Sequence, residues 1–101
     1  MKHCIIVKFK PDISVKTEDS FIGQIKNLFE ECLEIEGIHS VEVFKNCVAR
    51  GGRADIMIEI DMDKKALESY DKSDAHLMWK MEYSRFIESK MIFDYESNKS
   101  E

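Results

Sequence analysis

Apolar and polar residues alternate in four short segments of the chain. The segments lie at residues 3–9, 41–45, 56–62 and 90–95, and in each of them one face is mainly apolar. A period of two is typical of a β-strand that buries one face against a core. We therefore predict four strands in this order.

A helical pattern separates the first two strands. Pro11 and Asp12 end the first strand, because proline cannot donate to a sheet ladder, and a connection at residues 12–17 follows. Apolar side chains then recur at three- and four-residue steps, which indicates one helix with a buried stripe that reaches about Ile35. Gly37 supplies its C-terminal stop. The stripe consists of Phe21, Ile25, Leu28, Phe29, Cys32 and Leu33.

The segment 66–79 is predicted to form two helices instead of one. Tyr70 and His76 are six residues apart, and a continuous helix would turn them about 240° away from each other. The residues at 71–74 are poor helix formers or good caps, so we expect a break near Ser73. Ser73 then caps the second helix, with His76 in its first turn. With this break, the tyrosine hydroxyl and the imidazole can converge on one pocket.

The resulting order β-α-β-β-α-β predicts a ferredoxin-like α+β sandwich, in which two helices cover one face of a four-stranded antiparallel sheet. We expect one domain over residues 1–96 and a polar tail over 97–101. The other sheet face is more apolar than a monomer normally exposes, so a homodimer with its sheets packed face to face is expected. The apolar residues assigned to that face are Cys4, Ile6, Phe44, Met57 and Ile92.

Composition and charge narrow the class of protein further. The chain has 101 residues, of which 44% are hydrophobic and 35% charged, and its net charge is −5. An acidic chain without a basic cluster is not expected to bind nucleic acid or an anionic membrane. It lacks the roughly 18-residue apolar run of a membrane span and the pattern of a signal peptide. Three cysteines without metal-ligand spacing indicate free thiols and a cytoplasmic location.

Several motifs together resemble the stress-responsive α/β-barrel (Dabb) family. They are KHCIIVKFK at residues 2–10, GIHSVEVFKN at 37–46, the Tyr70-x5-His76 pair and MIFDY at 91–95. The resemblance covers nearly the whole chain. It implies a ferredoxin-like fold and a dimer whose two sheets form a barrel.

The resemblance also implies candidate catalytic residues. A plant relative, olivetolic acid cyclase, carries out an aldol cyclisation of a linear polyketide, and its tyrosine–histidine pair matches Tyr70 and His76. A further pocket histidine of the cyclase matches His3. Two features depart from the pattern. Family members often have H-P-x-H where this chain has Ser73-Asp74-Ala75-His76, and the cyclase histidine on the third strand is missing from residues 54–56.

These residues define a candidate site with a structural alternative for each. His76 is a candidate general base, and Tyr70 a candidate donor to a substrate carbonyl. Alternatively, His76 bonds only to backbone and Tyr70 packs in the core. The residues predicted to line a ligand cavity are His3, Ile5, Val7, Trp79 and Tyr83. We expect no metal and no cofactor, since the strand carboxylates Asp55, Glu59 and Asp61 have no histidine partners.

Three functions remain open at this stage. The protein is a dimer that holds a small apolar ligand with a polar end, or an enzyme, or a stress protein without a ligand. As an enzyme it would be a polyketide-cyclase-like lyase or a cofactor-free monooxygenase that uses Tyr70 and His76. An open cavity that reaches these two residues would favour the first two functions over the third.

Overall fold

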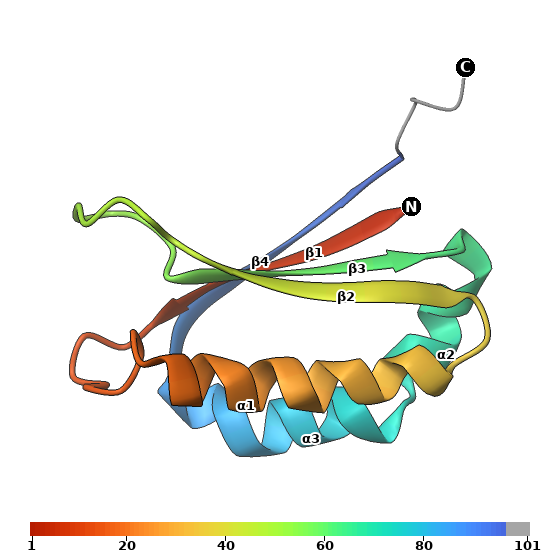
Figure 1. Ribbon diagram of the computed structural model, residues 1–101, viewed down its shortest axis with the longest axis horizontal. Coiled ribbons are helices and arrows are strands. Elements are labelled where there is room, and N and C mark those ends of the chain that lie inside the picture. The colour runs from red at the N-terminus through yellow and green to blue at the C-terminus, as the bar shows by residue number, and fades with distance from the viewer. Residues whose placement is uncertain (97–101) are drawn as a thin grey trace.

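The computed structural model describes residues 1–96 as one antiparallel sheet with two long helices on one side of it (Figure 1). The predicted tail at 97–101 lies outside the described residues. The strands are β1 (Lys2–Phe9), β2 (Ile38–Lys45), β3 (Ile56–Met62) and β4 (Ile87–Tyr95). The helices are α1 (Asp19–Glu30), α2 (Leu67–Asp71) and α3 (Asp74–Tyr83), with 3-10 turns at Glu31–Glu34, Lys64–Ala66 and Ser84–Phe86. The strand order β2-β3-β1-β4 confirms the predicted ferredoxin-like fold.

Three predicted boundaries were wrong, and one of them is the start of β4, which lies at Ile87 instead of residue 90. The first helix ends at Glu30 instead of continuing to Ile35, and the chain tightens into a 3-10 turn that exposes Leu33. Acidic residues crowd this end, where the helix dipole favours cations, and the last carbonyls lack helical partners. The second strand begins at Ile38, three residues before the predicted start, because it pairs with β3 over this whole length.

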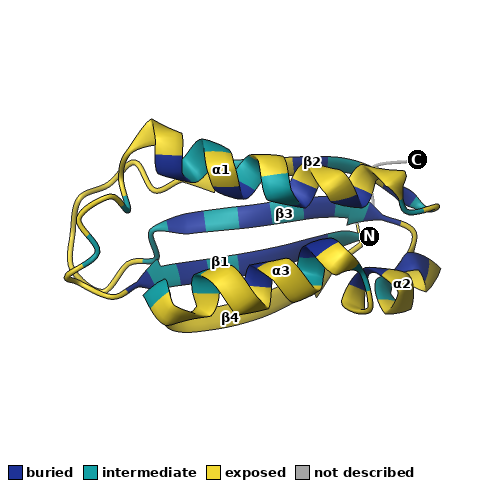
Figure 2. Cartoon of the chain, turned by 90° about the horizontal axis from the view of Figure 1, so that it is seen from below, coloured by how far each residue is buried: buried dark blue, intermediate teal, exposed yellow. Residues whose placement is uncertain are grey.

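The core lies between the sheet and the helices. Ile5, Val7 and Phe9 of β1 point into it and are almost completely buried. Phe29 of α1 meets Trp79 of α3 there, with 5.1 Å between ring centroids. Figure 2 shows β1 and β3 buried behind the helices, whereas β4 is exposed along nearly its whole length. One edge of the helix-covered face is therefore only partly covered.

The other sheet face is open to solvent in a single chain. Cross-strand pairing of β4 with β1 places Met91, Phe93 and Tyr95 on this face, opposite Ile6, Cys4 and Lys2 respectively. The assignment of Ile92 to this face was wrong. Ile92 pairs with Ile5 and faces the helices, because alternation along a strand defines two faces without specifying which one meets the core.

Candidate functional site

Ser73 forms the break between α2 and α3 as predicted. Its backbone is extended, with φ −71° and ψ 154°, so it cannot continue a helix. Its hydroxyl oxygen accepts a hydrogen bond from the backbone N–H of His76 at 3.2 Å, and the same hydroxyl donates to the Tyr70 carbonyl at 2.7 Å. One side chain thus caps α3 and closes the end of α2, which fixes Tyr70 and His76 relative to each other.

The ring of Tyr70 contacts two imidazoles. The centroid of the His76 ring lies 4.7 Å from that of Tyr70, and the His3 ring meets Tyr70 edge-on at 5.3 Å. His3 comes from β1, Tyr70 from α2 and His76 from α3. The break at Ser73 and the end of β1 therefore bring all three predicted polar residues into one cluster.

Both histidines are held through Nδ1. His3 Nδ1 lies 2.5 Å from Asp94 Oδ1, and His76 Nδ1 lies 3.0 Å from the Asp71 carbonyl oxygen. A carboxylate and a carbonyl can only accept, so each Nδ1 carries the proton. In the neutral form of either ring, Nε2 is then left with a free lone pair. The predicted backbone bond of His76 thus exists, and it leaves the second ring nitrogen available.

The hydroxyl of Tyr70 is buried without a hydrogen-bond partner among the described residues. The residue is 1% exposed. Burial, followed by the negative charges at Cys32 and Asp71, raises the pKa of the phenol far above its ordinary value of 10.0. The group therefore remains a protonated donor. An unsatisfied buried hydroxyl costs about 1–3 kcal/mol, and catalytic or binding roles are one reason for such a group to be kept.

A pocket of about 320 Å³ lies beside this cluster, between α2 and α3 on one side and β1 and β4 on the other. It sits at the partly covered edge of the sheet, and its rim carries the exposed residues Asp71, Lys80 and Lys90. Five of the predicted site residues line it, namely His3, Ile5, Tyr70, His76 and Trp79. Six lining residues were not predicted, namely Leu67, Asp71, Lys80, Lys90, Ile92 and Asp94.

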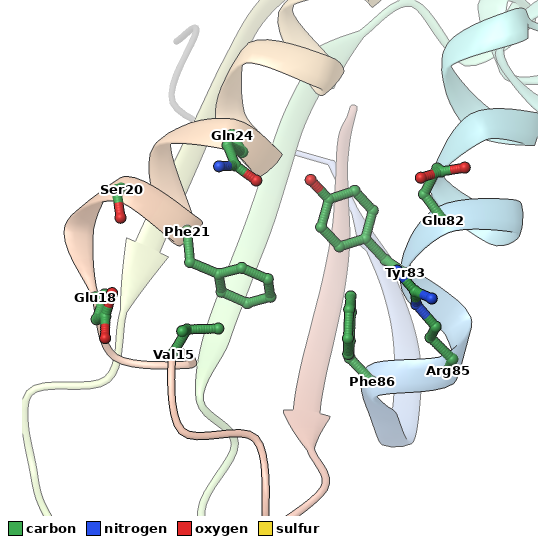
Figure 3. Close-up of a pocket in the computed structure, with 9 residues that line it drawn as sticks. All are labelled: Val15, Glu18, Ser20, Phe21, Gln24, Glu82, Tyr83, Arg85 and Phe86. Atoms are coloured by element: carbon green, nitrogen blue, oxygen red, sulfur yellow. The ribbon is translucent and has the colours of Figure 1, made fainter.

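Val7 and Tyr83 do not line this pocket. Val7 is fully buried in the core farther along β1. Tyr83 borders a different pocket, between the start of α1 and the end of α3, where its ring lies near Phe21 and Phe86 (Figure 3). The Phe21 centroid is 6.0 Å from that of Tyr83 and 5.8 Å from that of Phe86, so the rings pack against one another. We treat this second pocket as the end of the aromatic core.

The strand carboxylates have other partners. The side chain of Asp55 accepts a hydrogen bond from the Phe9 N–H at 2.8 Å, and Lys2 pairs with Glu59 and Asp61. Residues 1–96 contain no cluster of three or more histidine, cysteine or acidic side chains placed to hold a metal ion. No helix in the same residues is long and apolar enough to span a membrane.

The fold is that of a ferredoxin-like domain, and a small pocket lined by both polar and apolar side chains lies at one edge of its sheet. A family model described as the stress responsive A/B barrel domain (Dabb) matches residues 1–97, so the chain belongs to this family. Comparison with curated protein sequences found no match.

Solved structures with the same fold include proteins with and without a named activity. A dimeric ferredoxin-like protein of unknown function from Bacteroides fragilis matches with TM-score 0.77 and 21% identity, over 95% of this chain and 94% of that one. A Dabb family protein from Mesorhizobium loti matches with TM-score 0.71 and 15% identity, over 95% and 94%. Hydroxynitrile lyase from Passiflora edulis matches with TM-score 0.71 and 14% identity, over 98% and 94%. At these identities the similarity shows a common fold.

Proposed function

We propose that the protein is a homodimer in which each chain binds a small organic molecule in the pocket beside Tyr70. The observation that carries the proposal is that the ring of Tyr70, whose hydroxyl is buried and unpartnered, packs against two oriented imidazoles. A ligand oxygen that accepts from this hydroxyl would recover the hydrogen bond that the unliganded chain lacks.

The lining of the pocket indicates the general shape of the ligand. Ile5, Trp79 and Ile92 provide apolar surface, whereas His3, Tyr70 and His76 supply polar atoms on one side. Ligand sites commonly combine apolar walls with a few placed polar groups. A small molecule with an apolar body and one carbonyl or hydroxyl end fits this division.

The open sheet face supports the dimer. Phe93 and Met91 are 59% and 67% exposed on a face that also carries Phe44, Ile6 and Met57. Exposed apolar patches of this kind mark association surfaces. The structural neighbour from Bacteroides fragilis is a dimeric protein, and a second copy of this chain would cover the exposed apolar residues described here.

A ketone probe tests the ligand proposal. Acetophenone has an aromatic body and one carbonyl oxygen, and its binding can be followed by quenching of Trp79 fluorescence and by amide shifts around the pocket. Tyr70→Phe should weaken binding by about tenfold, because the hydrogen bond to the carbonyl is lost. Tyr83→Phe removes a hydroxyl from the other pocket and should change nothing. Equal affinities of the two variants, or no binding to the wild type, would reject the proposal.

A second candidate function is proton-transfer catalysis, and the His3–Asp94 contact favours it. Asp94 fixes the tautomer of His3, whose free Nε2 can act as a base while Tyr70 donates to the oxygen on which charge develops. His76 has the same orientation and is the alternative base. The passion-fruit lyase supports the idea only in that its fold is shared.

Exchange of the acetophenone methyl protons in D2O measures this activity directly by ¹H NMR. The wild type should accelerate exchange over buffer, and His3→Ala or His76→Ala should remove the acceleration while acetophenone still binds. Exchange at the buffer rate with acetophenone bound would leave a binding protein without this chemistry. If acetophenone does not bind either, a stress protein without a ligand in this pocket is the remaining function.

A further inference from the structure

Two lysines stand at the rim of the pocket without carboxylate partners. Lys80 comes from α3 and Lys90 from β4, so they approach the pocket from opposite sides. Within the described residues, neither has a carboxylate oxygen within 4.0 Å. Six other lysines do have one, namely Lys2, Lys8, Lys16, Lys45, Lys64 and Lys72.

The charge of the pocket differs from that of the chain as a whole. Lys80 and Lys90 balance the lining aspartates Asp71 and Asp94, so the pocket carries no net negative charge in a chain of net charge −5. The Asp94 carboxylate is also engaged by His3. The two ammonium groups are therefore free to meet a charge that arrives from solvent.

We propose that the ligand is a small organic acid whose carboxylate is received by Lys80 and Lys90, with its carbonyl or hydroxyl end directed to Tyr70. This inference rests on the proposed binding function and adds its charge selectivity. The two recognition elements lie at different depths, since the lysines are exposed and the Tyr70 hydroxyl is buried. A ligand with polar groups at both ends of an apolar body would reach both.

Two isosteric probes separate charge recognition from binding as such. 4-Acetylbenzoate and 4-acetylbenzamide share the ketone and the ring, and differ in whether the other end is charged. Wild-type protein labelled with ¹⁵N should bind the benzoate about tenfold more tightly than the benzamide, with amide shifts centred on α3 and β4. Raising the salt concentration should weaken only the benzoate, because exposed charges are screened.

Lysine substitutions test whether the preference for the charged probe arises at Lys80 and Lys90. Lys80→Gln and Lys90→Gln should each lower benzoate affinity about two- to fivefold and leave benzamide affinity unchanged, as expected for an exposed ion pair. Together they should remove the preference for the charged probe. Lys10→Gln replaces another exposed lysine that does not border the pocket, and it should leave both affinities unchanged.

The outcomes distinguish this inference from the proposed function. Equal binding of the two probes, or a benzoate preference that survives the double substitution, would overturn the carboxylate assignment and leave the binding pocket standing. Benzoate shifts centred on the loop between β2 and β3, which contains Arg50 and Arg53, would also overturn it, because they would show anion adsorption elsewhere. If neither probe binds, the pocket proposal fails and the carboxylate assignment fails with it.

Discussion

His3 and Asp94 stand directly opposite each other on β1 and β4, with 2.5 Å between Nδ1 and Oδ1. His3 is buried, whereas the Asp94 side chain is partly exposed. A hydrogen bond to a carboxylate is stronger than one between neutral groups. The pair therefore fastens the edge strand to the centre of the sheet and orients the imidazole at the pocket.

Asp94→Ala should lower the free energy of unfolding by about 1–3 kcal/mol, because it leaves the buried Nδ1–H of His3 without an acceptor. Urea denaturation measures the loss. Glu88→Ala is the matched control, since it removes another β4 carboxylate, one that pairs with Lys8 at 3.4 Å on the surface. That variant should lose less than about 1 kcal/mol. Equal losses would show that the Asp94 contact has no special strength.

Tyr70→Phe should keep or raise stability while it weakens ligand binding. The substitution removes a buried hydroxyl that has no partner, and the ring can remain in place. The expected gain is up to about 1 kcal/mol, part of the cost of an unsatisfied polar group. Thermal unfolding without ligand measures it. A clear loss of stability would mean that the hydroxyl has a structural partner, such as an ordered water.

Two glycines should respond to alanine with opposite signs. Gly37 has φ 94°, and an added Cβ would lie 3.0 Å from the Cβ of Ala66. Gly37→Ala should therefore destabilise by about 1–2 kcal/mol. Gly23 lies within α1 with open space around it, so Gly23→Ala should stabilise by about 0.5–1 kcal/mol. Chemical denaturation of both variants tests the pair, and a neutral Gly37→Ala would contradict the strain argument.

Stability should fall between pH 9 and pH 11 through Cys32. Burial, with a smaller contribution from the Glu31 charge, raises the pKa of its thiol from 9.0 to about 11. In this window the unfolded chain loses the thiol proton while the folded chain keeps it, so deprotonation favours unfolding. The two pH units correspond to a loss on the order of 2 kcal/mol by pH 11.

Cys32→Ala supplies the reference for this loss, since it removes the titrating group. Urea denaturation with reductant at pH 8 and pH 11 should show the stability advantage of the wild type shrinking by that amount. An advantage that stays constant with pH would contradict the raised pKa.

Substitutions at two exposed methionines test where the dimer interface lies, because one is on the proposed dimer surface and the other is not. Met91 on the open sheet face is 67% exposed, and Met81 of α3 is 73% exposed. Met91→Glu should yield monomers, because a carboxylate buried in the dimer interface would lose its hydration without gaining a partner. Met81→Glu should leave the dimer intact. Light scattering at micromolar concentration should give about twice 11.8 kDa for the wild type and for Met81→Glu; a dimeric Met91→Glu would refute this placement of the interface.

The fold was predictable because its signals are local. The alternation in β1 and β3, the apolar stripe of α1 and the cap at Ser73 are all visible within a few residues. The end of α1 was not predictable, because the apolar periodicity continues through the buried Cys32 although the backbone there has changed to a 3-10 turn.

The candidate site was only partly predictable. Tyr70 and His76 could be paired through the break between them. Asp94 and Ile92 depend on the register of β4 against β1, which is set by pairing across most of the length of the chain. The alternation in MIFDY separates Phe93 from Asp94 without indicating which of them faces the helices. Lys80 and Lys90 carry no local signal in the sequence, because they border one pocket only through the placement of α3 and β4 in the fold.

Ser73 caps α3 and closes the end of α2. The number of residues between Tyr70 and His76 therefore determines how their two rings face each other. One inserted residue after the cap would turn His76 by about 100° around α3 and away from the tyrosine ring. The side chains of Lys72 and Asp74, in contrast, are exposed, and the ion pair of Lys72 with Glu68 lies on the surface, so exchanges at these two positions should cost little. This segment can therefore vary at its exposed positions but not in length, and an insertion or deletion here would separate the two rings even in a chain that still folds.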